Sequence, residues 1–330
     1  MSVQESPRID SQADAQSLID AAGALLALRQ PGIPRDFLSA LFGLAVPEDL
    51  ERYSAEQIAA IADDAWSFLA QRQPGSPKIR RAPLADSIGG SALDIVNDDM
   101  PFLVDSVAGE LHERGLDILL LVHPVFSVER DAAGNLVGFD GVRRRVGRGE
   151  SYIRVHIDGV EEAAAGAAIV SEIEDILAEV RVCVDDWQAM IARAREVIAD
   201  LRKNPPPLPV EDIAEAVQFL EWLAADNFTL LGARDYAYTD DEQALQPIFE
   251  TGLGILRSPQ MRLLRRGSQL VTITPEIREF LEQPRLLIVA KAAVRSRVHR
   301  RVHLDYVGVK RFDPEGRLIG ERRFCGLFTS

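Results

Sequence analysis

The spacing of hydrophobic residues predicts helices in the first quarter of the chain. Three alanine-rich amphipathic segments, 12–30, 34–44 and 55–72, have the helical period, and Pro31-Gly32 and Pro47 separate them. Residues 73–90 are rich in proline, glycine and serine at their start, which predicts a linker. We therefore expect residues 1–80 to form a helical N-terminal segment.

The pattern then changes to short apolar runs with a helix between the first two of them. Strands are expected at 92–96, 117–128, 136–139 and 151–158, with a helix at 101–114. Polar and apolar residues alternate in the last of these strands, so we expect His156 to be exposed, like His112 on the helix. The order strand, helix, strand is typical of a βαβ unit.

A long apolar seam follows, with apolar residues four and three positions apart over 169–201. This spacing predicts a long helix, or two helices with a break, that packs along a neighbour. Packing within the chain and a dimer contact both remain open. Asn204-Pro-Pro-Pro-Leu-Pro209 stops the helix, so residues 186–209 are interpreted as the helix end and a proline-rich linker.

Residues 210–330 predict a second mixed region. An amphipathic helix at 210–226 precedes strands expected at 228–238, 269–274, 286–293, 301–312 and 318–328, with a short helix at 275–283. Asp313-Pro-Glu-Gly316 predicts the turn of a final hairpin. The fold class expected from this order is a multidomain α+β protein. Because the chain stops on a predicted strand, we expect it to be the front piece of a longer protein.

Composition narrows the class of protein. The net charge is −14, yet residues 257–330 contain 16 Lys and Arg against 7 Asp and Glu. Such a basic end could bind nucleic acid, but it more commonly complements an acidic body. No apolar run is long enough to span a membrane, and the start lacks the pattern of a signal peptide. Cys183 and Cys325 lie in apolar patterns, so we expect a reducing, cytoplasmic environment without disulfides.

Most enzyme signatures are missing from the sequence. Gly252-Leu-Gly254 has two glycines of a dinucleotide-binding loop, but Arg257 occupies the position of the third, which favours a turn. His299 and His303 would share a face if they lay on one strand. Two arginines lie between them, and no thiolate or cluster of acidic residues is near, so we expect no metal site.

The most informative polar cluster is Asn97, Asp98 and Asp99, which precedes the helix expected to begin at Pro101. One interpretation is that these side chains cap the helix and bind water. The other is that the carboxylates hold the amino group of a small ligand while the helix amides hold its carboxylate. Asp105, one turn later, could join either arrangement.

Several motifs together resemble the N-terminal region of the large bacterial NAD-specific glutamate dehydrogenases. They are Asn97-Asp-Asp-Met-Pro-Phe-Leu-Val-Asp-Ser106, His123-Pro124, Glu150-Ser151, Phe219-Leu-Glu-Trp-Leu223, Asp226-Asn-Phe-Thr-Leu-Leu-Gly232, Gly252-Leu-Gly254, Val307–Gly316 and Gly320–Thr329. Departures are small: Ala233 and Arg234 replace a frequent aromatic, and Cys325 replaces an aliphatic residue. The resemblance implies a ferredoxin-like ACT-like domain at 88–185 and a PAS-like domain at 210–330.

In the resembled family the dehydrogenase domain lies far downstream. The resemblance therefore implies that the full-length enzyme uses NAD to convert L-glutamate to 2-oxoglutarate and ammonium, whereas this segment binds no NAD and has no catalytic residue. Two hypotheses for its role stay open. It could sense a small amino acid through Asn97, Asp98, Asp99 and Asp105. Alternatively, it could be a non-catalytic scaffold in which the 169–201 seam forms a homo-oligomer. In either case the rest of the same polypeptide is an expected partner.

Overall fold

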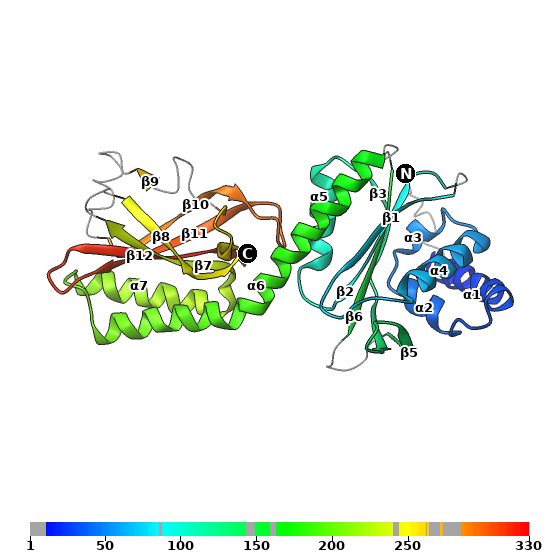
Figure 1. Cartoon of the computed structure of the whole chain (residues 1–330), viewed down its shortest axis with the longest axis horizontal. Helices are drawn as coiled ribbons and strands as arrows, with labels where there is room; N and C mark the ends of the chain where they lie inside the picture. Colours follow the sequence, from blue (N-terminus) through cyan, green and yellow to red (C-terminus); the bar gives the residue numbers. More distant parts are fainter. Residues whose placement is uncertain are drawn as a thin grey trace, which may run out of the picture. The chain divides into compact units, whose positions relative to one another are not determined.

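The computed structural model describes residues 11–85, 88–142, 149–158, 163–239, 244–261, 263, 271–272 and 285–329. The chain divides into two units, Met1–Leu177 and Ala178–Ser330, and the described residues of each contain one six-stranded antiparallel sheet (Figure 1). Helices pack against both sheets. The expected mixture of helices and antiparallel strands is thus confirmed.

The N-terminal helices cover one face of the first sheet (Figure 1). They are α1 (Ser11–Arg29), α2 (Phe37–Phe42), α3 (Pro47–Leu50) and α4 (Ala55–Leu69). Ser54 and Gln57 form a capping box that fixes the start of α4. An aromatic cluster then joins helices to sheet, because the ring of Phe37 lies 4.9 Å from Trp66 and 5.7 Å from Phe126.

The expected linker at 73–90 is partly wrong, because it contains strand β1 (Lys78–Pro83). This strand pairs antiparallel with β2 (Ser91–Asp98), and Lys78 lies opposite Val96. Its sequence, Lys-Ile-Arg-Arg-Ala-Pro, has little strand character of its own. The pairing with a buried neighbour therefore decides its conformation.

Strand β6 (Glu150–Ile157) organises the rest of the first sheet, whose order is β1-β2-β6-β4-β5 with β3 also paired to β6. Both β2 and β3 (Ile118–Val122) run antiparallel to β6, so β2, α5 (Leu103–Glu113) and β3 form a split βαβ unit. The single strand expected at 117–128 is broken at His123-Pro124, since a proline cannot donate to the ladder. The remaining strands are β4 (Val125–Arg130) and β5 (Leu136–Val142).

A buried charged network lies between α4 and the first sheet. Asp94 accepts hydrogen bonds from Arg154 and from the hydroxyl of Tyr152, and Arg154 also donates to Asp64 of α4 at 2.9 Å. His156, which we expected to be exposed, is fully buried in the same network. The expectation was wrong because the face that alternation marked as polar is covered by helices.

Helix α6 (Ala163–Lys203) is one continuous helix of 41 residues, which settles the choice between one helix and two. Nine of the ten seam residues between Ile169 and Leu201 are buried, and Trp187 is about half exposed. The seam is therefore covered almost completely within the chain itself.

The second sheet has the order β10-β11-β12-β7-β8-β9, and the second half of α6 and α7 pack on one of its faces (Figure 1). Its elements are α7 (Val210–Trp222), η1 (Leu223–Asn227), β7 (Phe228–Thr239), β8 (Ala244–Gly254), η2 (Ile255–Arg257), β9 (Val271–Thr272), β10 (Leu287–Arg295), β11 (His303–Phe312) and β12 (Leu318–Phe328). The expected final hairpin is confirmed. Strand β8 was missed, and the helix expected at 275–283 lies outside the described residues.

The pair His299 and His303 is not on one strand. His303 begins β11, whereas His299 lies in the preceding loop with a left-handed φ of 65°. The two imidazoles therefore do not share a strand face, and the described residues contain no cluster of His, Cys, Asp and Glu that could hold a metal ion.

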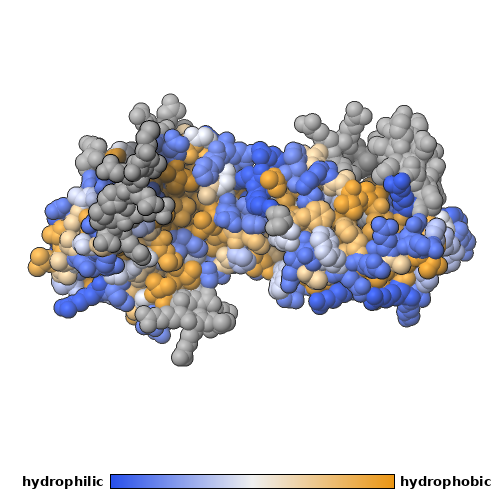
Figure 2. All heavy atoms as spheres, turned by 180° about the vertical axis from the view of Figure 1, so that it is seen from behind, coloured by the Kyte–Doolittle hydropathy of each residue, from blue (hydrophilic) through white to orange (hydrophobic). Residues whose placement is uncertain are grey.

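Hydrophilic and hydrophobic residues are interspersed over the face of the molecule drawn in Figure 2. Among the helices that the structure describes, none combines the length and the apolar character that crossing a membrane requires.

Candidate functional site

The acidic segment that the sequence singled out lies at the end of β2. Strand β2 continues through Asp98, so Asn97 and Asp98 pair with Ser151 and Glu150 of β6 instead of lying in a turn. Asn97 is buried in the sheet. Asp99 follows the strand, and its amide donates to the carbonyl of Gly149 at 3.0 Å.

A cleft of about 1050 Å³ opens beside this strand end. The described residues that line it are Arg72, Pro74, Gly75, Asp98, Asp99, Met100, Pro101, Val128, Arg130, Gly149 and Glu150. Two of the four predicted residues, Asp98 and Asp99, are therefore brought together at the cleft. Asn97 and Asp105 are not in its lining, and Asp105 is exposed on the first turn of α5.

Arg72 fixes the carboxylates on one side of this cleft. Its guanidinium donates to Asp98 at 2.6 Å, to Glu150 at 2.8 Å and to the carbonyl of Ser76 at 2.9 Å. The Arg72 side chain is 1% exposed, whereas that of Asp98 is 36% exposed. Asp98 thus presents a carboxylate to the cleft that is held in place from behind.

Arg130 approaches Glu150 from the other side. Its Nε and one terminal nitrogen each lie 2.7 Å from a different carboxylate oxygen of Glu150, the bidentate geometry of a strong ion pair. The same guanidinium donates to the carbonyls of Leu69 and Gly134. Glu150 is therefore shared by two arginines that come from segments 58 positions apart in the sequence.

Sequence reasoning did not select Arg72 or Arg130 as site residues. Arg72 lies next to the segment interpreted as a linker, and Arg130 ends a strand that was expected two residues shorter. The one available signal was Glu150-Ser151, a motif of the family resemblance that had no assigned role. It marks the residue on which both guanidinium groups converge.

The start of α5 differs from a simple cap. Its N-cap residue is Phe102, which has a left-handed φ of 73° and makes no side-chain cap. The N-cap position of α5 is therefore occupied by Phe102 and not by one of the acidic residues. A positive φ is uncommon for a bulky residue, and such conformations concentrate at ligand and switch sites. Met100 and Pro101, which line the cleft, lie directly before it.

His123 lies near Asp99, and its Nε2 lies 2.6 Å from the hydroxyl oxygen of Ser151. Burial lowers the pKa of His123, and the negative charge of Asp99 opposes this shift. The imidazole is therefore neutral at physiological pH and adds no cation to the cleft.

The glycine pair of the second unit has a structural role. Gly254 ends β8 with a left-handed φ of 57°, and its amide donates to Asp186 of α6 at 2.7 Å. Arg257 forms an ion pair with the same carboxylate. Gly252-Leu-Gly254, which was expected to be a turn, is the end of strand β8, and the hydrogen bond from its last amide to Asp186 anchors it to α6.

Comparison with known proteins gives the relationship of the chain. The family described as "Glutamate dehydrogenase, ACT1 domain" matches residues 37–173. The chain is 33% identical over 310 residues to the NAD-specific glutamate dehydrogenase of Halomonas elongata and 34% identical over 305 residues to that of Pseudomonas aeruginosa. Each alignment covers 89% of this chain. The corresponding enzyme of Mycobacterium tuberculosis is 26% identical over 243 residues.

The chain spans about a fifth of the length of these curated relatives, 19% and 18% for the first two. The matched ACT1 segment includes the acidic end of β2, the whole cleft and the first turns of α6. The predicted resemblance is therefore confirmed, and this chain is a relative of the NAD-specific glutamate dehydrogenases that contains their ACT1 domain.

Proposed function

We propose that this chain is the regulatory N-terminal region of a NAD-dependent glutamate dehydrogenase and binds a small amino acid in the cleft of its first unit. The observation that carries the proposal is the convergence of Asp98 and Asp99 with Arg72 and Arg130 on one cleft within the ACT1 segment. An amino acid is a zwitterion, so a site for it needs groups of both charges close together.

The cleft offers both kinds of group. Asp98 and Asp99 present carboxylates for the ligand's ammonium group, while the buried and internally paired guanidinium groups of Arg72 and Arg130 contribute positive potential near its carboxylate. Met100 and Val128 supply apolar surface for a short side chain. Arg72 also donates to the Ser76 carbonyl, and Arg130 donates to the Gly134 carbonyl. A ligand that interacts with these guanidinium groups would therefore be coupled to the segments that contain Ser76 and Gly134.

The catalytic activity belongs, in this proposal, to the rest of a longer polypeptide. The complete enzyme would convert L-glutamate, NAD⁺ and water to 2-oxoglutarate, ammonium and NADH, with NAD bound outside this region. The second unit would be PAS-like, and the partner of both units would be the remaining polypeptide. The length of the curated relatives supports this division. Incubating the purified chain with L-glutamate and NAD⁺ should produce no NADH. A steady increase in the absorbance of NADH would contradict the proposal.

Calorimetric titration of the purified chain with a panel of L-amino acids tests the sensing role. At least one should release heat, and Asp99→Asn should weaken it about tenfold or more, because a charge-assisted contact is lost. Asp105→Asn is the matched control, since Asp105 is exposed on α5 outside the cleft. An equal loss of affinity in both variants, or the absence of heat with every amino acid, would count against the cleft as the amino acid binding site.

A further inference from the structure

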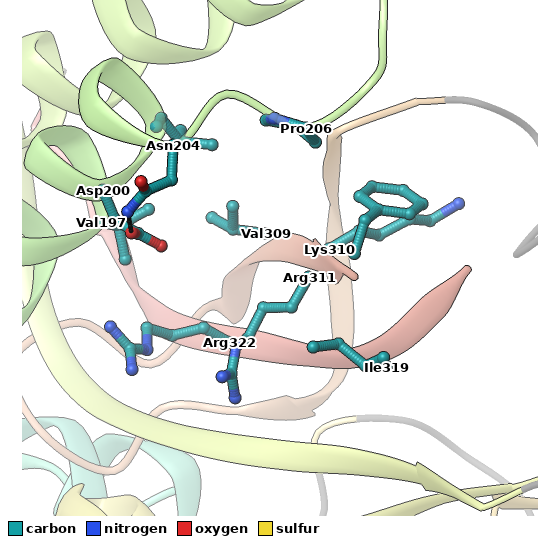
Figure 3. A pocket seen from close by; sticks show the side chains of 11 residues that line it. Val197, Asp200, Asn204, Pro206, Val309, Lys310, Arg311, Ile319 and Arg322 are labelled. Atoms are coloured by element: carbon teal, nitrogen blue, oxygen red, sulfur yellow. Dashed lines mark hydrogen bonds between the residues drawn. The ribbon is translucent and has the colours of Figure 1, made fainter. Parts of the chain in front are cut away.

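A second pocket lies in the second unit, at the C-terminal end of α6 (Figure 3). Its volume is about 170 Å³, which exceeds the space of one water roughly tenfold and suits a small organic molecule. Its walls are the last turns of α6, the proline linker and the β11–β12 hairpin. Gly316 of the hairpin turn approaches the ring of Pro207, so the linker and hairpin are in contact beside the pocket.

One side of the pocket is negative. Asp200 and Asn204 project from the end of α6, and the Asn204 side-chain amide donates to Asp200 at 3.0 Å (Figure 3). The last carbonyls of a helix add partial negative charge at this end. An ammonium group is the ligand group that such a wall favours.

The hairpin contributes positive charge to the pocket. Arg311 of β11 and Arg322 of β12 lie below Asp200 and Asn204 in the view of Figure 3. Arg322 is held in a bidentate pair with Asp235, both distances being 2.8 Å. Arg311 is exposed and has no hydrogen bond or ion pair with any residue in the described part of the chain. Its charge is therefore available to a carboxylate, while Arg322 is committed within the protein.

The buried Lys310 also lines the pocket, and the other walls are apolar. Val197, Leu201, Val309, Phe312, Ile319 and Pro206 form this apolar lining. Ile319 is 43% exposed and therefore offers aliphatic surface to a ligand in the pocket. A ligand that matches these walls has a positive group, a negative group and an aliphatic part.

We propose that this pocket binds a free α-amino acid with an aliphatic side chain. Its carboxylate would pair with Arg311, its ammonium group would contact Asp200 and Asn204, and its side chain would lie against Ile319 and Val309. The proposal concerns a different unit from the cleft around Asp99 and does not depend on the function proposed for that cleft.

L-Norvaline is a suitable probe, because two analogues each remove one of its charges. Pentanoate lacks the ammonium group, and butylamine lacks the carboxylate. Saturation-transfer NMR and calorimetry with the whole chain should detect binding of L-norvaline at millimolar concentration. Each analogue should bind at least about tenfold more weakly than L-norvaline. Absence of binding by L-norvaline, or pentanoate binding equally well, would overturn the proposal.

Variants separate this pocket from the cleft. Arg311→Gln and Asp200→Asn should each weaken L-norvaline binding about tenfold or more, and Asp200→Asn keeps the acceptor for Asn204. Arg317→Gln is the control, since Arg317 is an exposed arginine of the same hairpin that pairs with Asp313 outside the pocket. Binding that is lost in Asp99→Asn but kept in Arg311→Gln would assign the probe to the cleft and contradict this proposal.

Discussion

The Nε–H of Arg154 donates to Nε2 of His156 across 2.9 Å, inside the network that joins α4 to the first sheet. This contact requires Nε2 of His156 to be an acceptor, so the imidazole is neutral and its proton is on Nδ1, 2.8 Å from the Tyr53 hydroxyl. Burial and the Arg154 charge lower the pKa of His156 to about 3. The pair therefore holds a histidine that does not titrate near neutral pH.

This shift predicts a pH dependence of stability. The unfolded chain protonates His156 below about pH 6.5, whereas the folded chain does not until about pH 3. The free energy of unfolding should therefore fall as pH decreases through this window, with a slope contribution approaching about 1.4 kcal/mol per pH unit. His156→Gln should lack this contribution.

Urea unfolding from pH 7 to pH 5 measures the difference between the two proteins. Trp66 is the one tryptophan of the first unit, so its fluorescence in a Trp187→Phe, Trp222→Phe background reports that unit. If the free energy of unfolding changed with pH in the same way for wild type and His156→Gln, the imidazole of His156 would not be neutral and buried.

Asp94 is predicted to be a stability determinant of the first unit. It is fully buried and accepts hydrogen bonds from Arg80, Tyr152 and Arg154. Asp94→Asn leaves these arginines without their buried counter-charge and should cost about 3 kcal/mol of unfolding free energy. Asp117→Asn, at an exposed position in the same unit, should change it by less than about 0.5 kcal/mol. Similar urea midpoints for the two variants would refute the assignment.

Gly134 should tolerate no side chain, because two constraints act on it. Its φ is +82°, and a Cβ there would collide with the backbone carbonyl of Arg72. Gly115 has a similar φ of +72° but nothing within 4 Å of its Cβ position. Gly115→Ala should therefore cost about 1 kcal/mol, from backbone strain alone, and Gly134→Ala clearly more. Thermal unfolding of both variants measures the difference, and equal shifts would mean that the close approach to Arg72 has no energetic effect.

Cys183 and Cys325 are predicted to be unreactive in the folded chain. Burial raises the pKa of Cys183 to about 12 and also raises that of Cys325, so neither forms the nucleophilic thiolate at pH 8. The Cys183 thiol also donates to the carbonyl of Leu231. A colorimetric thiol reagent should detect no thiol before guanidinium is added and both thiols afterwards. Rapid labelling of the native protein would contradict the burial of these residues.

Much of the secondary structure could be predicted because the signals are local. The seam of α6 and the alternation of β11 and β12 around Asp313-Pro-Glu-Gly316 repeat with the period of the element itself. Strands β1 and β8 were missed because their own sequences have weak strand character. Pairing with the neighbouring strand in the chain, β2 for β1 and β7 for β8, decides their conformation.

The sequence by itself determined the periods of helices and strands, the turns, the family relationship and the acidic end of β2. The tertiary structure alone decided that Asp98 and Asp99 share a cleft with Arg72 and Arg130, that Asn97 lies inside the sheet, and that Asp105 is not part of the cleft lining. The physical reason is that periodicity records only the face on which a residue lies. Whether that face is covered, and by which charge, depends on segments far away in the chain.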